Sequence, residues 1–327
     1  MNSVATRFLP LILSGALTAY AQDSRLGTFH ADRALDGTAQ TALEVNRLTV
    51  TISRESAEVV SIITKSLAYD VGPPAVGVFE SGSCVLLDGF HGILEFYDPS
   101  GALVRTVSLM KDAVPEYERV MPFAVHDRSV TVAASEPGLA GIRLFRFTEL
   151  GEPVFSAVLS GGFASAVVMS NSGMSVAVGS ARWNIGVLEE ATFLVSASGV
   201  IQSTLPVPCS FGAFSLDDSL LLVVSVDELS LVSVAGGMVR SRMPFGAGRI
   251  VLDAASKEGG FVVISAFDPV LQEGHWRYED LRVERIEADG TRFTVPGDFQ
   301  QAFGSARLKR VDGEVLLQID GVLQPLR

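Results

Sequence analysis

The chain has 327 residues, of which 37 are acidic and 25 basic, and its formal net charge is −12. Because nucleic-acid binding draws its affinity from clustered Lys and Arg, this balance argues against a nucleic-acid partner. Only two cysteines occur, Cys84 and Cys209, both in apolar surroundings. Their places in the repeats described below are far apart, so we expect two buried free thiols rather than a disulfide.

The first 21 residues have the layout of a secretory signal peptide. Arg7 precedes an apolar run over residues 8–19, and small residues stand at positions 19 and 21. A membrane anchor or a buried helix is the alternative, but the run is shorter than the roughly 20 residues that a bilayer crossing needs. We expect cleavage before Gln22, a secreted or periplasmic mature chain and no membrane span.

Short apolar or alternating runs, separated by Gly, Asp, Ser or Pro, follow one another through the rest of the chain. Examples are AVGVFESG, SVTVAAS, MSVAVGS, SLLLVVSV and GFVVISAF. Short apolar runs that are separated by turn-forming residues indicate strands. We therefore predict an all-β chain, with an N-terminal extension over residues 22–45 and a single domain over residues 46–327.

An imperfect sequence repeat occurs along this domain: a hydrophobic strand, a turn with glycine, and a more polar strand. It is clearest in LEFYDPSGALVRTVSL (94–109), and LRVERIEADGTRFTV (281–295) is one of its copies. The turn glycines are Gly101, Gly151, Gly199, Gly236 and Gly290. A period of about 40 to 50 residues with four strands per unit is typical of a β-propeller, in which each unit is one blade.

The two ends of the domain decide the number of blades. The last unit, residues 305–327, supplies only three strands, while NRLTVTIS (46–53) stands alone ahead of the first complete unit. One N-terminal strand that completes the last blade would remove an open sheet edge. We predict six blades, the last closed by this strand. Seven blades remain open, because residues 54–74 could contain further strands.

The stretch GSCVLLDGFHGILEFYDPSGALVRTVSL (82–109) resembles an NHL-type repeat of six-bladed propellers. FGAFSLDDSLLLVVSV (211–226) resembles a looser propeller phrase, Ser-x-Asp-Gly before a hydrophobic strand, with Asp218 in place of the glycine. The resemblance implies the fold of that family. It implies no particular activity, because propellers host unrelated functions.

Catalytic and metal motifs are absent from the sequence. No HExxH, CxxC, GxSxG or GxxxxGK[ST] occurs, and no two of the four histidines have metal-ligand spacing. Several aspartates lie in or beside expected turns: Asp88, Asp98, Asp217, Asp218, Asp253 and Asp268. Aspartate also favours turns for its own local hydrogen bonds. We expect no cofactor; if a Ca²⁺ site exists, Asp88 is the best single candidate ligand, at the end of a strand in the best-formed blade.

Alternate turns of an up-and-down blade leave from opposite ends of the sheet, and here the insertions fall on one of these two sets. They cover residues 110–122, 135–141, 180–191 and 267–280. These segments carry the predicted ligand-binding residues Tyr117, Arg182, Trp183, His275, Trp276, Arg277 and Tyr278. Aromatic residues and arginine dominate binding hot spots. The alternative is that each tryptophan covers the apolar end of its own blade.

These observations predict a secreted, non-enzymatic propeller, expected to be a monomer, that binds a protein or a glycan on its loop-rich face. The alternative of another class is a metal-dependent propeller hydrolase or lactonase that acts at the central channel. It would need at least three carboxylate or amide ligands at strand ends of different blades, and the sequence offers candidates without such a set. A purely structural surface component cannot be separated from the binding protein by sequence.

Overall fold

The structure is a computed structural model, and it describes residues 37–44, 47–54, 59–66, 75–88, 92–109, 122–136, 141–225, 228–245, 248–267, 270–272, 275–297, 301–303, 306–311, 313–319 and 322–326. Every regular element in these ranges is a β-strand. The predicted all-β class is therefore confirmed. None of the described residues belongs to a helix long and apolar enough to cross a membrane.

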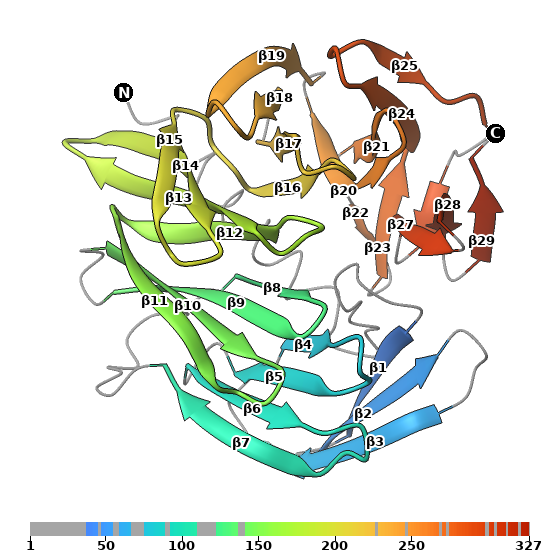
Figure 1. Ribbon diagram of the computed structural model, residues 1–327. Helices are drawn as coiled ribbons and strands as arrows, with labels where there is room; N and C mark the ends of the chain where they lie inside the picture. Colours follow the sequence, from blue (N-terminus) through green and yellow to red (C-terminus); the bar gives the residue numbers. More distant parts are fainter. Residues whose placement is uncertain are drawn as a thin grey trace. The chain divides into compact units, whose positions relative to one another are not determined.

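Five four-stranded sheets follow one another along the chain, as the colours of Figure 1 show. The first contains β4 (Ala75–Val78), β5 (Cys84–Asp88), β6 (Ile93–Tyr97) and β7 (Leu103–Ser108). The second contains β8 (Phe123–His126), β9 (Ser129–Ser135), β10 (Gly141–Thr148) and β11 (Pro153–Ser160). The third contains β12 (Phe163–Met169), β13 (Ser175–Asn184), β14 (Val187–Ser196) and β15 (Ile201–Leu205). The fourth contains β16 (Phe211–Phe214), β17 (Leu220–Val224), β18 (Glu228–Ser233) and β19 (Met238–Pro244), and the fifth contains β20 (Arg249–Lys257), β21 (Gly260–Phe267), β24 (Arg282–Glu287) and β25 (Arg292–Thr294).

Three-stranded sheets stand at both ends of the described chain. The N-terminal sheet contains β1 (Gly37–Glu44), β2 (Arg47–Arg54) and β3 (Val59–Ser66), and the C-terminal sheet contains β27 (Ala306–Val311), β28 (Glu314–Ile319) and β29 (Val322–Pro325). Strand β2 pairs with β1 on one edge and with β3 on the other. The predicted pairing of residues 46–53 with the last sheet is therefore wrong, because both hydrogen-bonding edges of this strand are occupied. Strand β1 begins inside residues 22–45, which were predicted to be an extension outside the domain. Strand β3 lies within residues 54–74, where the sequence allowed further strands.

The recurring glycine phrase forms a tight turn before the outermost strand of a sheet. In the first sheet, Asp98 Oδ1 accepts hydrogen bonds from the backbone nitrogens of Ser100 at 2.8 Å and Ala102 at 2.9 Å. Gly101 closes this turn with φ of 83°, a conformation that side-chain-bearing residues rarely adopt. The repeat glycines at 151, 199 and 290 take φ of 75°, 84° and 90° at the matching place. In the fourth sheet the left-handed residue is Gly237, one position after the predicted Gly236.

The chain divides into two compact units: unit 1 is Met1–Pro137 with Phe145–Ser156, and unit 2 is Gly138–Leu144 with Ala157–Arg327. In unit 1, one core cluster joins residues of β4 to β6 with residues of β8 and β9. Phe96 and Phe147 meet there edge to face, with ring centroids 6.1 Å apart. Such aromatic pairs contribute beyond the apolar area that they bury.

In unit 2, the middle strands serve two cores at once. Leu221 and Val223 of β17 pack with residues of the third sheet, whereas Leu222 and Val224 pack toward the fifth. Strand β21 has the same arrangement. Phe261 packs in the cluster formed by the fourth and fifth sheets, whereas Val262 packs in the cluster formed by the fifth and the last sheet. Since successive strand residues point to opposite faces, a fully apolar run is what a strand buried on both faces requires.

Candidate functional site

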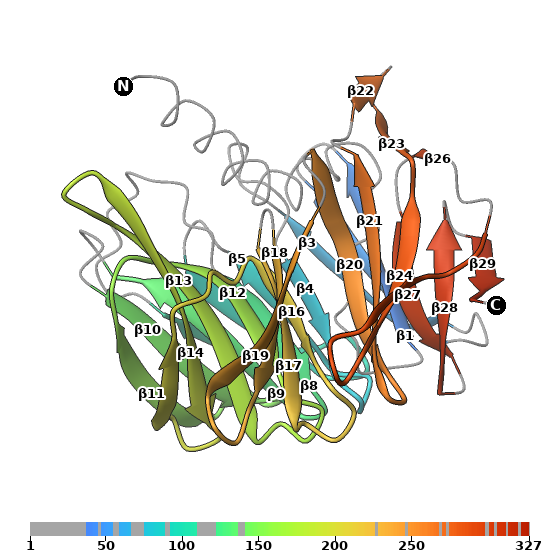
Figure 2. The ribbon, with the colours of Figure 1, turned by 90° about the horizontal axis from the view of Figure 1, so that it is seen from above.

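The insertion at residues 267–280 contributes two strands to a small separate sheet rather than forming an irregular loop. Strand β23 (His275–Glu279) lies in its centre, between β22 (Val270–Gln272) and β26 (Gln301–Phe303). Trp276 pairs with Leu271, and His275 pairs with Gln272. Figure 2 shows that β22 and β23 extend beyond the ends of β21 and β24. We name this three-stranded sheet the platform; the side chains of His275 and Trp276 lie outside its described part.

Tyr278 fixes the platform to the core of unit 2. Its side chain is 0% exposed and packs in the same apolar cluster as Val262 and Ile264 of β21. Tyr278, which the sequence placed among the ligand-binding residues of an insertion, is therefore not available on the surface, because the alternation of β23 directs this ring inward. The neighbouring Arg277 is partly exposed and forms an ion pair with Glu279 at 3.2 Å.

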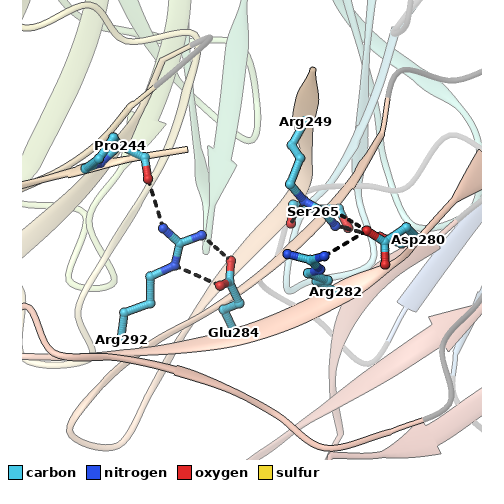
Figure 3. Close-up of polar contacts among 7 residues, drawn as sticks. All are labelled: Pro244, Arg249, Ser265, Asp280, Arg282, Glu284 and Arg292. Carbon is cyan, nitrogen blue, oxygen red and sulfur yellow. Dashed lines mark hydrogen bonds and ion pairs between the residues drawn. The ribbon is translucent and has the colours of Figure 1, made fainter. Parts of the chain in front are cut away.

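A buried arginine holds the segment that leads from the platform back into the fifth sheet (Figure 3). The Arg249 side chain is 4% exposed, and its Nη1 lies 2.6 Å from Asp280 Oδ2. Its Nη2 donates to the backbone oxygen of Asp280 at 2.5 Å and to that of Ser265 at 3.2 Å. Arg282 binds the same carboxylate at 3.0 Å. The hydrogen bond from Arg249 lowers the pKa of Asp280, with the charges of both arginines adding to the effect.

A second arginine cluster in Figure 3 connects the fourth and fifth sheets. Arg292 of β25 donates to the two carboxylate oxygens of Glu284 at 2.8 and 2.6 Å. It also donates to the backbone oxygen of Pro244, at the end of β19, at 3.1 Å. Its guanidinium lies over the ring of Phe245, 4.7 Å from the centroid. The planar guanidinium of arginine can make such contacts at the same time. Arg292 therefore connects the end of the fourth sheet to the fifth sheet.

The predicted insertion at residues 180–191 is an extension of β13 and β14. Their ladder continues from Ser175↔Ser196 to Asn184↔Val187, with a turn of only two residues. Figure 2 shows this hairpin extending past the rest of its sheet. Arg182 pairs with Glu189, with Nε and Nη2 at 2.6 and 2.5 Å from Oε2. Trp183 lies on β13, and its side chain lies outside the described part.

Sequence reasoning missed the residue at the tip of this hairpin, Ile185. Its relative exposure is 98%, and its φ is +47°. Gly186 follows with φ of +79°, so both central residues are left-handed, as in a type I′ turn. The sequence does contain a signal: Asn184 and Gly186 within alternating runs indicate a tight hairpin, and isoleucine is a poor residue for the position between them.

No protein-family model and no curated protein sequence matches this chain. Solved structures do match it: the Dos1 propeller has a TM-score of 0.61 at 9% identity, with 87% of this chain and 73% of that chain covered. KlHsv2 with loop 6CD replaced by a Gly-Ser linker has a TM-score of 0.56 at 10% identity, with 90% of each chain covered. A chain in the crystal structure of the Mitotic Checkpoint Complex has a TM-score of 0.59 at 13% identity, with 90% and 91% covered. The fold is a β-propeller. The successive sheets other than the platform are its blades; five of them have four strands in the described part of the chain, and the number of blades fits roughly six.

Several candidate carboxylates of the propeller have structural roles in turns. Asp218, which replaces the glycine of the propeller phrase, adopts the left-handed φ of 58° that glycine would take. Its carboxylate accepts from the backbone nitrogens of Asn171 at 2.7 Å and Ser172 at 2.9 Å, in the blade before it. Asp217 accepts from the Ser215 hydroxyl at 2.7 Å, and this bond lowers its pKa. Asp217 therefore stabilises its own turn, and Asp218 connects this turn to the preceding blade.

Asp88 ends β5 and is half-buried. In the described part of the chain, no three His, Cys, Asp or Glu side chains group together as a metal site would require. Tyr117 lies outside the described residues. The remaining predicted ligand-binding residues lie on two elements of unit 2: Arg182 and Trp183 on β13, and His275, Trp276, Arg277 and Tyr278 on β23.

Both cysteines are free and buried, as predicted. Burial raises the pKa of Cys84 and of Cys209 to about 12. Since the thiolate is the reactive form, neither residue has the properties of a nucleophile or a redox centre.

Proposed function

We propose that this chain is an exported, non-enzymatic binding propeller that engages a protein or a glycan at the blade ends bearing the platform and the β13–β14 hairpin. The NHL-like phrase at residues 82–109 supports membership of that repeat class, and residues 1–21 support export. That a similar propeller chain belongs to a mitotic checkpoint complex supports a protein as the partner.

The platform is the observation on which this proposal mainly rests. Its strands extend beyond the fifth blade, so the blade does not need them for its own ladder. Yet the chain anchors them with a fully buried Tyr278 and with the buried Arg249. A rigid support that carries His275, Trp276 and Arg277 lowers the ordering cost of binding, and functional residues concentrate on segments held by a rigid scaffold.

The test uses the mature chain, residues 22–327, with Trp276→Ala and Trp183→Ala. Binding is measured on a glycan array and against extracellular proteins that copurify with the chain under native conditions. We expect each variant to keep the wild-type thermal midpoint and to lose about 30-fold in affinity for the partner so identified, as truncation of an interface anchor does. Unchanged affinity in both variants would contradict the proposal.

The hydrolase alternative is separated by two measurements on the same preparation. Elemental analysis determines the metal content of the purified chain, and a lactone and ester panel measures hydrolysis. One equivalent of Ca²⁺ together with hydrolysis that chelation abolishes would replace the binding function by the enzymatic one, and Asp88→Asn would then be the first variant to examine.

A further inference from the structure

The tip of the β13–β14 hairpin combines full exposure with an unfavourable backbone. Ile185 has φ of +47°, and left-handed backbone is an outlier for a β-branched residue. The other described non-glycine residues with positive φ are all aspartates: Asp127, Asp218 and Asp280. Aspartate tolerates this conformation, because its short side chain can bond locally to the backbone.

The fold gains no packing from isoleucine at this place. The side chain of Ile185 is 98% exposed, and a Cβ added at Gly186 would meet no atom within 4 Å. Val187 adds a second exposed apolar side chain, at 62%. A residue that is strained and buries nothing within its own chain points to a contact with another molecule.

The base of the hairpin makes this tip rigid. Glu189 accepts from Asn184 Nδ2 at 2.7 Å and from Arg182 Nε at 2.6 Å, so the last strand residue and a residue two positions before it bind one carboxylate. Two strands of ten residues each continue from this base into the third blade. The apolar tip is thus presented without the entropy loss of ordering a loop on binding.

We propose that Ile185 is an anchor that enters an apolar, cation-rimmed pocket on a protein partner. This inference rests on the proposed binding function and names the class of partner. A single branched aliphatic side chain on a narrow hairpin fits a pocket better than a flat surface. The chain carries a net charge of −12, and Glu190 beside the base is exposed. Like charges therefore disfavour an anionic lipid surface or a second copy of this chain, and favour a partner with basic residues around the pocket.

The test first identifies the partner with a photo-crosslinking residue at Val187, which leaves Ile185 intact. A chain with the crosslinker at Met238 is the control, because that side chain is similarly exposed, at 64%, at the start of β19 in another blade. Both chains are irradiated in the extracellular fraction of the source cells, and the adducts are identified by mass spectrometry. We expect one protein that crosslinks from position 187 and not from 238. The absence of such a protein overturns the proposal.

The identified protein is then purified and titrated with the mature chain. We expect Ile185→Asn to weaken binding by about 10- to 100-fold, as removal of a buried isoleucine anchor should, and Ile185→Val by less than about tenfold. The matched control Ile201→Asn, which changes an exposed isoleucine on β15, should stay within about twofold of wild type. Wild-type affinity in Ile185→Asn overturns the proposal. If Trp276→Ala abolishes binding while Ile185→Asn does not, the binding function stands and only the anchor is refuted.

Two further measurements test whether the tip instead binds a lipid surface or a second copy of this chain. Sedimentation with vesicles of phosphatidylcholine, with and without phosphatidylserine, shows whether the chain binds lipid. Sedimentation equilibrium shows whether it self-associates. Vesicle binding or self-association that Ile185→Asn abolishes would overturn the protein pocket and assign the tip to a membrane or to a second copy.

Discussion

Replacement of Ile185 by asparagine should make the protein more stable. A left-handed backbone costs an ordinary L-residue about 1 to 2 kcal/mol, and asparagine recovers part of this cost because it is favoured at this position of a type I′ turn. The isoleucine side chain is 98% exposed, so its removal sacrifices almost no buried apolar area. We expect the free energy of unfolding to rise by about 1 kcal/mol, which in a protein of this size raises the thermal midpoint by about 2 °C.

Calorimetry or circular dichroism on the mature chain measures this shift. Ile201→Asn is the matched control, because Ile201 is 42% exposed on β15 and is not among the residues with positive φ. It should lower the midpoint slightly, since asparagine is a poor strand residue. A midpoint of Ile185→Asn that falls as in the control would refute the strain at the tip and remove the main physical support for an anchor there.

Three further predictions concern other side chains of the propeller. Asp280→Asn keeps a residue that tolerates positive φ but removes the charge opposite Arg249. The Asp280 carboxylate is partly exposed, so solvent screening limits the lost stability to about 0.5 kcal/mol near neutral pH. Because the pKa of Asp280 lies below its ordinary value of 3.8, this difference should vanish as the pH falls through that lowered pKa. Thermal midpoints of both chains between about pH 7 and pH 2 test this, and a difference that persists in acid would contradict it. Tyr278→Ala should cost about 3 kcal/mol or more in denaturant unfolding and Tyr278→Phe about 1 kcal/mol; equal stability of Tyr278→Ala and wild type would contradict its burial. Thiol titration should find neither Cys84 nor Cys209 reactive in the native protein and both reactive after unfolding, and recovery of a disulfide-linked peptide would be the opposite result.

Local patterns in the sequence predicted the strands well where both faces of a strand are buried. SLLLVVSV and GFVVISAF are apolar throughout because β17 and β21 pack against a core on each face. The turn glycines were found because left-handed backbone favours a residue without a side chain, as at Gly101 with its φ of 83°. Such requirements involve residues close in sequence, so a single sequence expresses them.

Pairing between distant segments left no comparable local pattern. The strand NRLTVTIS was correctly identified, but its partners could not be, since its alternation fits the edge of any sheet equally. Its hydrogen-bonding partners in the structure are β1 and β3. The inward position of Tyr278 was missed for a related reason: the insertion was interpreted as a loop, in which no alternation assigns a face, whereas β23 is a strand.

The same comparison explains why Ile185 stands out among the unusual positions of the chain. At Asp218 a left-handed backbone is accompanied by a residue that tolerates it and by two bonds to the preceding blade. At Asp280 it is accompanied by the contact with Arg249. Each of these departures from ordinary backbone serves the fold in which it occurs. Ile185 has the same backbone without a suitable side chain and without a described contact that repays the strain. A local conflict that the fold does not explain is expected at a functional position, and this places the first variant to be made at the tip of the hairpin.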